Sequence, residues 1–209
     1  MSDTRLKILD TAERLFGEEG YQPVSLRHIT AAAGVNLASI HYHFGSKEEL
    51  LEALVERRAT PVNAERMESL QRLKEAAGPN PIALEDLLEA FMIPAFHSAD
   101  RNPGWARVMG RLYAEGVMPA IARKHFSPVG DSFFAELRRT LPGLSEEELA
   151  WRTHFAIGAM AHTLTAPPLE LPLCSTVEPP SDVARRMVAF LSGGFRAPLP
   201  EQETVEVKR

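Results

Sequence analysis

The residues with the most specific chemistry lie in one stretch, residues 25–47, which reads SLRHITAAAGVNLASIHYHFGSK. Its hydroxyl, amide, imidazole and basic side chains can hydrogen-bond to phosphate oxygens and to the edges of bases. No Asp or Glu occurs from Gly20 to Lys47, although the whole chain of 209 residues has a net charge of −5. A phosphate-facing surface needs local rather than global positive charge. The stretch therefore predicts contact with nucleic acid.

Catalysis and metal binding find less support in the residues. His41 and His43 are two residues apart, which directs them to different sides of a helix, and no Cys or acidic ligand accompanies them. The chain has no Gly-rich phosphate loop and no nucleophile elbow. The spacing of the other histidines, such as His125, His154 and His162, matches no catalytic pattern. We therefore predict no catalytic residue, no metal site and no cofactor, so the protein is not expected to be an enzyme.

The elements that position this stretch are two short helices and a turn. Ser25 can cap a helix whose apolar residues recur at a spacing of three and four, and Gly34 follows the last of them as a helix stop. A second short helix covers residues 37–44. Ser46 and Glu49 then have the spacing of a capping box that opens another helix. This is a helix-turn-helix arrangement, whose second helix enters the major groove of DNA.

The runs ILDTAERLFGEEGYQPVSLRHIT and AAAGVNLASIHYHFGSKEELLEAL together resemble the DNA-binding signature of the tetracycline-repressor (TetR) family of bacterial regulators, over about residues 5–56. The resemblance implies an all-α fold, with an N-terminal three-helix helix-turn-helix DNA-binding domain and a larger C-terminal helical domain for ligand binding and dimerisation.

We divide the chain into a DNA-binding domain (1–46), a connecting helix (47–77), a ligand-binding and dimerisation domain (78–196) and a disordered tail (197–209). Because proline lacks an amide hydrogen, Pro61 predicts a kink or break in the connecting helix near residue 60, and Pro94 a bend or end in the helix from residue 84. A further helix over residues 118–140 is predicted to break near Pro128. The proline-rich segment 166–180 is predicted to be a loop.

The resemblance, together with the helical phase, assigns the DNA contacts. Leu37 and Ala38 are expected to meet bases, and Ser39, Tyr42, His43 and Lys47 to meet phosphates or neighbouring backbone. Tyr42 is expected at the surface, because Ile40 and Phe44 occupy the inward phase of the helix. The full predicted set is Ser25, Arg27, Asn36, Leu37, Ala38, Ser39, His41, Tyr42, His43 and Lys47.

Aromatic and Met side chains gather in the middle of the sequence, where they could line an effector pocket or simply form core. Arg111 with Tyr113 could face a carboxylate or a phosphate, which suggests an acyl-chain or other amphipathic acid as effector. The predicted ligand-binding residues are Phe91, Phe96, Trp105, Met109, Arg111, Tyr113, Met118, Phe126, Phe134 and His154.

Dimerisation is expected because helix-turn-helix proteins usually bind two half-sites related by a twofold axis. In the family the two C-terminal helices of each subunit form a four-helix interface, and residues 146–165 and 181–193 match these helices in position. The alternative is that both helices are buried in the monomer. The predicted interface residues are Phe155, Ala159, His162, Met187, Phe190 and Leu191.

These observations predict a ligand-responsive, sequence-specific transcriptional regulator, a repressor released from a palindromic double-stranded DNA operator by a small amphipathic or lipophilic effector. A helical architectural or protein-binding module is the alternative, and an enzyme is a more distant one. The single cysteine and the N-terminus without an apolar signal core indicate a cytoplasmic protein, and no apolar run is long enough for a membrane span.

Overall fold

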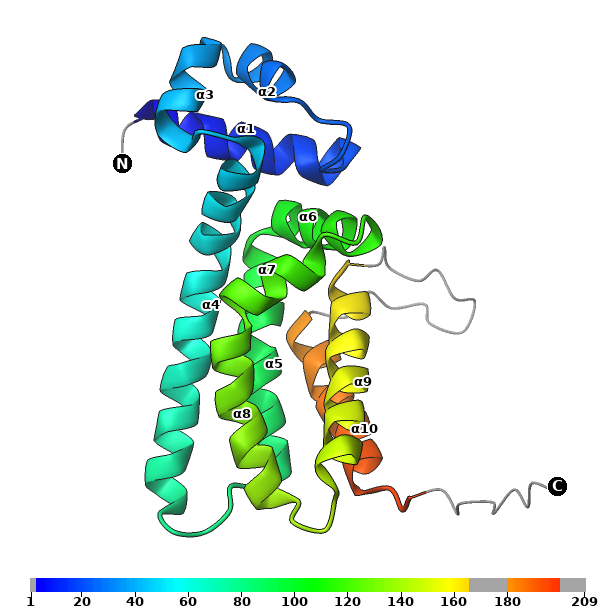
Figure 1. The fold of residues 1–209 in the computed structure, drawn as a ribbon. Helices are drawn as coiled ribbons and strands as arrows, with labels where there is room; N and C mark the ends of the chain where they lie inside the picture. Colours follow the sequence, from blue (N-terminus) through cyan, green and yellow to red (C-terminus); the bar gives the residue numbers. More distant parts are fainter. Residues whose placement is uncertain (1–2, 166–179, 200–209) are drawn as a thin grey trace, which may run out of the picture.

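The computed structural model describes residues 3–165 and 180–199, and in these residues the chain forms ten α-helices and no strand (Figure 1). The all-α prediction is thereby confirmed. The segment 166–179, with most of the predicted proline-rich loop, and residues 200–209 of the predicted tail lie outside the described residues. The helices are α1 (Asp3–Glu19), α2 (Leu26–Ala33), α3 (Leu37–Phe44), α4 (Lys47–Ala77), α5 (Leu84–Arg101), α6 (Pro103–Ala114), α7 (Met118–His125), α8 (Ser127–Thr140), α9 (Glu146–Thr165) and α10 (Pro180–Arg196).

The head of the molecule consists of α1, α2, α3 and the first turns of α4, at the top of Figure 1. Its core contains Phe16, Ile29, Ile40, Phe44 and Leu50, all buried. These side chains lie at the inward phase of their helices, as the apolar spacing predicts. Burial of such a small set gives limited stability. The core is extended by four buried apolar side chains of α6 and α7, namely Trp105, Val108, Leu112 and Ile121.

The helix α4 runs without interruption for 31 residues from the head along the rest of the molecule, so the predicted break near Pro61 is wrong. Proline removes one helical hydrogen bond and crowds the preceding turn, but packing on both sides of that turn can hold the helix together. Here Ala59 and Val62 are buried beside Pro61. In the same way α5 continues through Pro94 to Arg101, with Met92 and Phe96 buried on either side.

The body consists of α5, α8, α9 and α10 with the distal half of α4, and has its own apolar core. The helix α5 lies in its centre, in contact with α4, α8 and α10. The predicted break in residues 118–140 exists, but it falls at Phe126, between α7 and α8, and Pro128 lies inside the first turn of α8. Proline is favoured there because the first helical N–H groups have no partner in the helix.

Among the described residues, no helix is both long and apolar enough to cross a membrane. No group of three or more His, Cys, Asp or Glu side chains in residues 3–165 and 180–199 is arranged to hold a metal ion.

Candidate DNA-binding surface and effector cavity

A glycine helix stop and an asparagine helix cap set the position of α3. Gly34 ends α2 with φ +62° and ψ +38°, a left-handed conformation that side chains with a Cβ rarely adopt. Asn36 then caps α3, because its Oδ1 accepts hydrogen bonds from the backbone N–H and from the hydroxyl of Ser39, both at 2.8 Å. The turn is therefore short and fixed, and it holds α3 at a defined angle to α2.

The structure brings all ten predicted DNA-binding residues together on the head. Tyr42 projects furthest, with 85% of its surface exposed, while Ile40 and Phe44 of the same helix are buried. Leu37 packs partly against the head core, so it offers less surface to a thymine methyl than the sequence suggests. Six of the ten residues are exposed, namely Ser25, Arg27, Asn36, Ala38, His41 and Tyr42, and four are half-buried, namely Leu37, Ser39, His43 and Lys47.

Besides Asn36 and Ser39, the side chains of His41 and Lys47 also have partners within the head. The Nδ1 of His41 lies 2.8 Å from the carbonyl oxygen of Gly45. A carbonyl oxygen can only accept, so Nδ1 is the donor of this hydrogen bond. Lys47 donates to the carbonyl oxygen of Gln22 at 3.1 Å and lies 4.3 Å from the centre of the Tyr21 ring. Burial lowers the pKa of Lys47 from its usual value, but the ammonium keeps N–H groups for a phosphate.

Sequence reasoning missed two basic residues of α1. The ammonium of Lys7 lies 3.8 Å from the position that a Cβ on Gly34 would take, which places it beside the turn between α2 and α3. The guanidinium of Arg5 lies 5.1 Å from the centre of the Phe44 ring. Both therefore add positive charge near α3. Nothing in their own stretch of sequence signals this, because it depends on how α1 crosses the other two helices.

The helix α6 holds the head at its α1–α2 turn. The carboxylate of Glu115, just after α6, accepts hydrogen bonds from the backbone N–H groups of Tyr21 at 2.9 Å and Gln22 at 2.8 Å. Gly20 makes this approach possible, since its φ is +98° and a Cβ there would lie 2.5 Å from a carboxylate oxygen of Glu115. Burial and the neighbouring carboxylates of Glu48 and Glu115 raise the pKa of Tyr21 to about 12, so its phenol is neutral.

A buried carboxylate makes a second connection. Glu13 of α1 accepts hydrogen bonds from Arg57 at 2.6 Å and from Arg58 at 2.8–3.0 Å, both on α4. Arg58 also donates to the side chain of Asn102 at 2.6 Å, at the joint between α5 and α6. One ion-pair network thus joins the head, the long helix and the α5–α6 joint.

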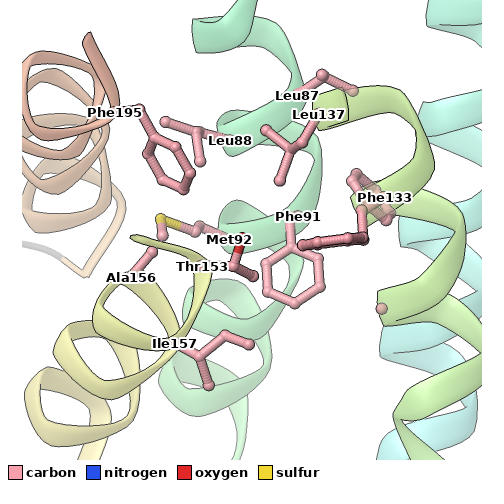
Figure 2. Close-up of a pocket in the computed structure, with 12 residues that line it drawn as sticks. Leu87, Leu88, Phe91, Met92, Phe133, Leu137, Thr153, Ala156, Ile157 and Phe195 are labelled. Carbon is pink, nitrogen blue, oxygen red and sulfur yellow. The ribbon is translucent and has the colours of Figure 1, made fainter. Parts of the chain in front are cut away.

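The body contains an apolar cavity of about 40 Å³ between α5, α8, α9 and α10. In Figure 2 the rings of Phe91 and Phe133 lie at one side of it, where they meet edge to face, and Phe195 and Ile157 lie at other sides. The hydroxyl of Thr153 lies at its wall but already donates to the carbonyl oxygen of Leu149 at 2.8 Å. The full lining is Leu87, Leu88, Phe91, Met92, Gly130, Phe133, Phe134, Leu137, Thr153, Ala156, Ile157 and Phe195.

Of the ten predicted ligand-binding residues, only Phe91 and Phe134 line this cavity, and Phe96 is buried in the same core beside it. Four others, Trp105, Met109, Met118 and Phe126, belong to the head core instead. The reason is that α6 packs against α1 and α7 against α4, so their apolar faces turn toward the head. Aromatic content alone could not distinguish these two cores.

The polar residues of that set also lie away from the cavity. Arg111 donates to the backbone carbonyl oxygen of Glu18 at 3.2 Å, and Tyr113 is exposed at the end of α6. His154 lies on the outer face of α9 beside Trp151. Arg111 and Tyr113 therefore do not line this cavity, because α6 presents both residues outside it.

The outer face of α9 and α10 carries large exposed apolar side chains. Phe155 is 62% exposed and stacks on Trp151, with 5.8 Å between ring centroids, and Phe190 of α10 is 78% exposed. Among the other predicted interface residues His162 is exposed, and Ala159 and Met187 are half-buried. Leu191 is buried in the core of the body, which corrects its assignment. It shares the inward phase of α10 with Ala184, Val188 and Phe195.

Two models of known protein families match this chain. Residues 8–54 match the family described as "Bacterial regulatory proteins, tetR family". Residues 89–194, just over half of the chain, match the family described as "Tetracyclin repressor-like, C-terminal domain". The chain belongs to the TetR family. The helices α1–α3 thus lie in the N-terminal region of the family, and α5–α10 lie in the region of its C-terminal domain.

Curated relatives match about a quarter of the chain. The HTH-type transcriptional repressor AcnR of Corynebacterium efficiens is 40% identical over 52 residues, which cover 25% of this chain and 28% of that protein. Solved structures match over most of the chain at lower identity and show the shared fold. The TetR family regulator PfmR from Thermus thermophilus has a TM-score of 0.62 at 22% identity, covering 88% of this chain and 96% of its own. The ketosteroid regulator KstR2 of Mycobacterium tuberculosis has 0.63 at 18%, covering 93% and 95%.

Proposed function

We propose that this protein is a ligand-responsive transcriptional repressor that binds a palindromic DNA operator as a homodimer. The observation that carries the proposal is the surface of α3, which exposes Tyr42 and His41 within a stretch that has no acidic residue from Gly20 to Lys47. Such a surface can approach phosphates without like-charge repulsion. The family membership supports the same conclusion.

The effector in this proposal is a small lipophilic or amphipathic molecule that binds in the body. The apolar cavity lined by α5, α8, α9 and α10 supports this class. A structural relative described as a ketosteroid regulator is consistent with it. Effector binding would release DNA by favouring a conformation in which the two heads are wrongly spaced, and this requires different effector affinities in the two states. The contacts of Glu115 and Glu13 with the head supply a path for that coupling.

Selection of binding sites from random or genomic DNA with the purified full chain tests the proposal. We expect enrichment of a palindrome whose half-sites are about one helical turn apart, roughly 10 base pairs from centre to centre. A Lys47→Ala protein should enrich it less. The absence of any enriched sequence at low salt would contradict the proposal and favour a protein-binding helical module. Binding of the same protein to DNA in which the selected sequence is scrambled measures non-specific binding and serves as the control.

A further inference from the structure

Arg66 of α4 is a buried cation whose partners within the described residues are all neutral. Only 4% of its surface is exposed. Its Nε donates to the carbonyl oxygen of Phe91 at 2.7 Å, and its Nη1 donates to the side chain of Asn63 at 3.2 Å. Among the described residues the other buried arginine, Arg152, binds the carboxylate of Glu148 at 2.7 Å, and the half-buried Arg57 and Arg58 bind that of Glu13.

A buried guanidinium without an anion is unfavourable, because the lost hydration is not offset by an opposite charge. Burial lowers the pKa of Arg66 to about 10, and the carboxylate of Glu65 opposes this shift only in part. Arg66 therefore remains charged at neutral pH. An anionic ligand would supply the charge that the protein does not.

Arg66 lies directly behind one wall of the apolar cavity. Its guanidinium carbon is 4.2 Å from the centre of the Phe91 ring. The same ring lines the cavity and meets Phe133 edge to face, with centroids 5.2 Å apart (Figure 2). A single aromatic ring thus separates the apolar space from the cation. Because 40 Å³ holds little more than a water molecule or two, a ligand must displace the Phe91 and Phe133 rings, which would bring it to Arg66.

The same junction contains a buried polar atom without a hydrogen-bond partner among the described residues, on His125. The side-chain amide of Asn63, which binds Arg66, also donates to the backbone carbonyl oxygen of His125 at 2.7 Å. The Nε2 of His125 is buried and has no hydrogen-bond partner in the part of the chain that the structure describes. The polar groups where α4, α5 and α7 meet therefore have unused hydrogen-bonding capacity.

We infer that Arg66 is the anion-binding residue of the effector site, and that the effector is a monocarboxylate with an apolar tail. The tail occupies the space between α5, α8, α9 and α10 when Phe91 moves aside, and the carboxylate pairs with the guanidinium of Arg66. One buried cation balances one negative charge, and the planar guanidinium matches the two oxygens of a carboxylate. This inference rests on the proposed effector-responsive function.

Isothermal titration of the full chain with octanoate and with octanol tests the inference, since the two probes share a tail and differ in charge. We expect octanoate to bind roughly 10- to 100-fold more tightly than octanol, the range of a hydrogen-bonded buried charge. Arg66→Gln should abolish this preference. Arg72→Gln is the matched control, because Arg72 lies on the same helix but is exposed and binds Ser69. Equal binding of the two probes by the wild type, or an unchanged preference in Arg66→Gln, would overturn the inference.

Two further measurements keep the result decisive. If Arg66→Gln does not fold, Arg66→Lys takes its place, because it retains the positive charge. We expect Arg66→Lys to retain a preference for octanoate over octanol. Loss of that preference would overturn the inference. Octyl phosphate is expected to bind more weakly than octanoate, because its second charge has no cation to meet; tighter binding would overturn the carboxylate assignment. DNA-site selection reports on the other proposal separately. If the protein binds DNA but shows no preference for octanoate, only the inference about Arg66 is contradicted. If it prefers octanoate but selects no DNA sequence, the proposed repressor function is contradicted instead.

Discussion

At the scale of single residues, Tyr42 is the most direct test of the DNA-binding surface. Because its side chain is 85% exposed, Tyr42→Ala should leave the fold intact. Removing its contact with the charged backbone should weaken operator binding by roughly tenfold or more. Fluorescence anisotropy with a labelled operator measures this. Tyr113→Ala is a matched control, since Tyr113 is also exposed but belongs to α6. Equal operator affinities for the two variants would remove Tyr42 from the interface.

Glu13 is the residue on which the stability of the head–helix junction depends most. It is buried and binds two arginines; in Glu13→Gln, Arg58 loses its counter-charge and Arg57 keeps only its more exposed pair with Asp10. We expect a loss of about 3–5 kcal/mol in the free energy of unfolding, the usual result of breaking a buried pair from one side. Urea denaturation followed by circular dichroism measures it. Glu18→Gln is the control: its pair with Arg14 is exposed and should contribute less than about 1 kcal/mol. A Glu13 variant as stable as this control would contradict the argument.

The sequence predicts the exposure of the residues on α3 better than the positions of the proposed effector-site residues, and the reason is local geometry. Tyr42 and Ile40 are assigned correctly to outside and inside because the phase of a single short helix decides both. Arg66 and Arg111 cannot be assigned that way. Their environments depend on which distant helix packs against them: Arg66 lies behind Phe91 of α5, while Arg111 reaches Glu18 of α1. Helical periodicity contains no information about such long-range partners.

At the scale of elements, α6 is the helix whose role the sequence hides. Its apolar pattern resembles that of a pocket helix, yet it packs on α1 and ends in the carboxylate that holds the α1–α2 turn. The same limit applies to Pro61, where a local rule predicts a break and tertiary packing preserves the helix. Boundaries set by caps, such as the helix starts at Ser25 and Ser46, are predictable because the capping residues are neighbours in sequence.

Removing the α6 contact should loosen the head without unfolding the body. In Glu115→Ala the backbone N–H groups of Tyr21 and Gln22 lose their acceptor. We expect their amide hydrogen exchange to accelerate by roughly tenfold or more, while amides in α5 and α10 exchange as before. Hydrogen-exchange mass spectrometry measures both. Glu75→Ala serves as control, because Glu75 binds Gln71 near the far end of α4. Unchanged exchange at residues 20–22 would show that other contacts hold the turn.

At the scale of the whole molecule, two cores meet at one polar layer. The head core includes side chains from α6 and α7, and the body core surrounds the cavity. Between them lie the Glu13 network and, further along α4, the Asn63–Arg66 contacts. A ligand that draws Arg66 toward its own charge acts on the same helix that Glu13 anchors to the head. The long, continuous α4 therefore offers a mechanical connection between effector and DNA, provided that the two conformations bind the effector with different affinity.

The same reasoning at this scale predicts how the chain assembles. A single head contacts one half-site, so tight operator binding requires two heads held together. The exposed Phe155 and Phe190 form an apolar face on α9 and α10, which a twofold partner would cover.

We expect Phe155→Asp combined with Phe190→Asp to give monomers in analytical ultracentrifugation and to lower operator affinity by roughly 100-fold, the lower end of the gain from joining two sites. Binding to a single half-site should stay unchanged. Met67→Asp alters an exposed apolar residue of α4 and should leave the dimer intact. A double variant that still sediments as a dimer would place the interface elsewhere on the molecule.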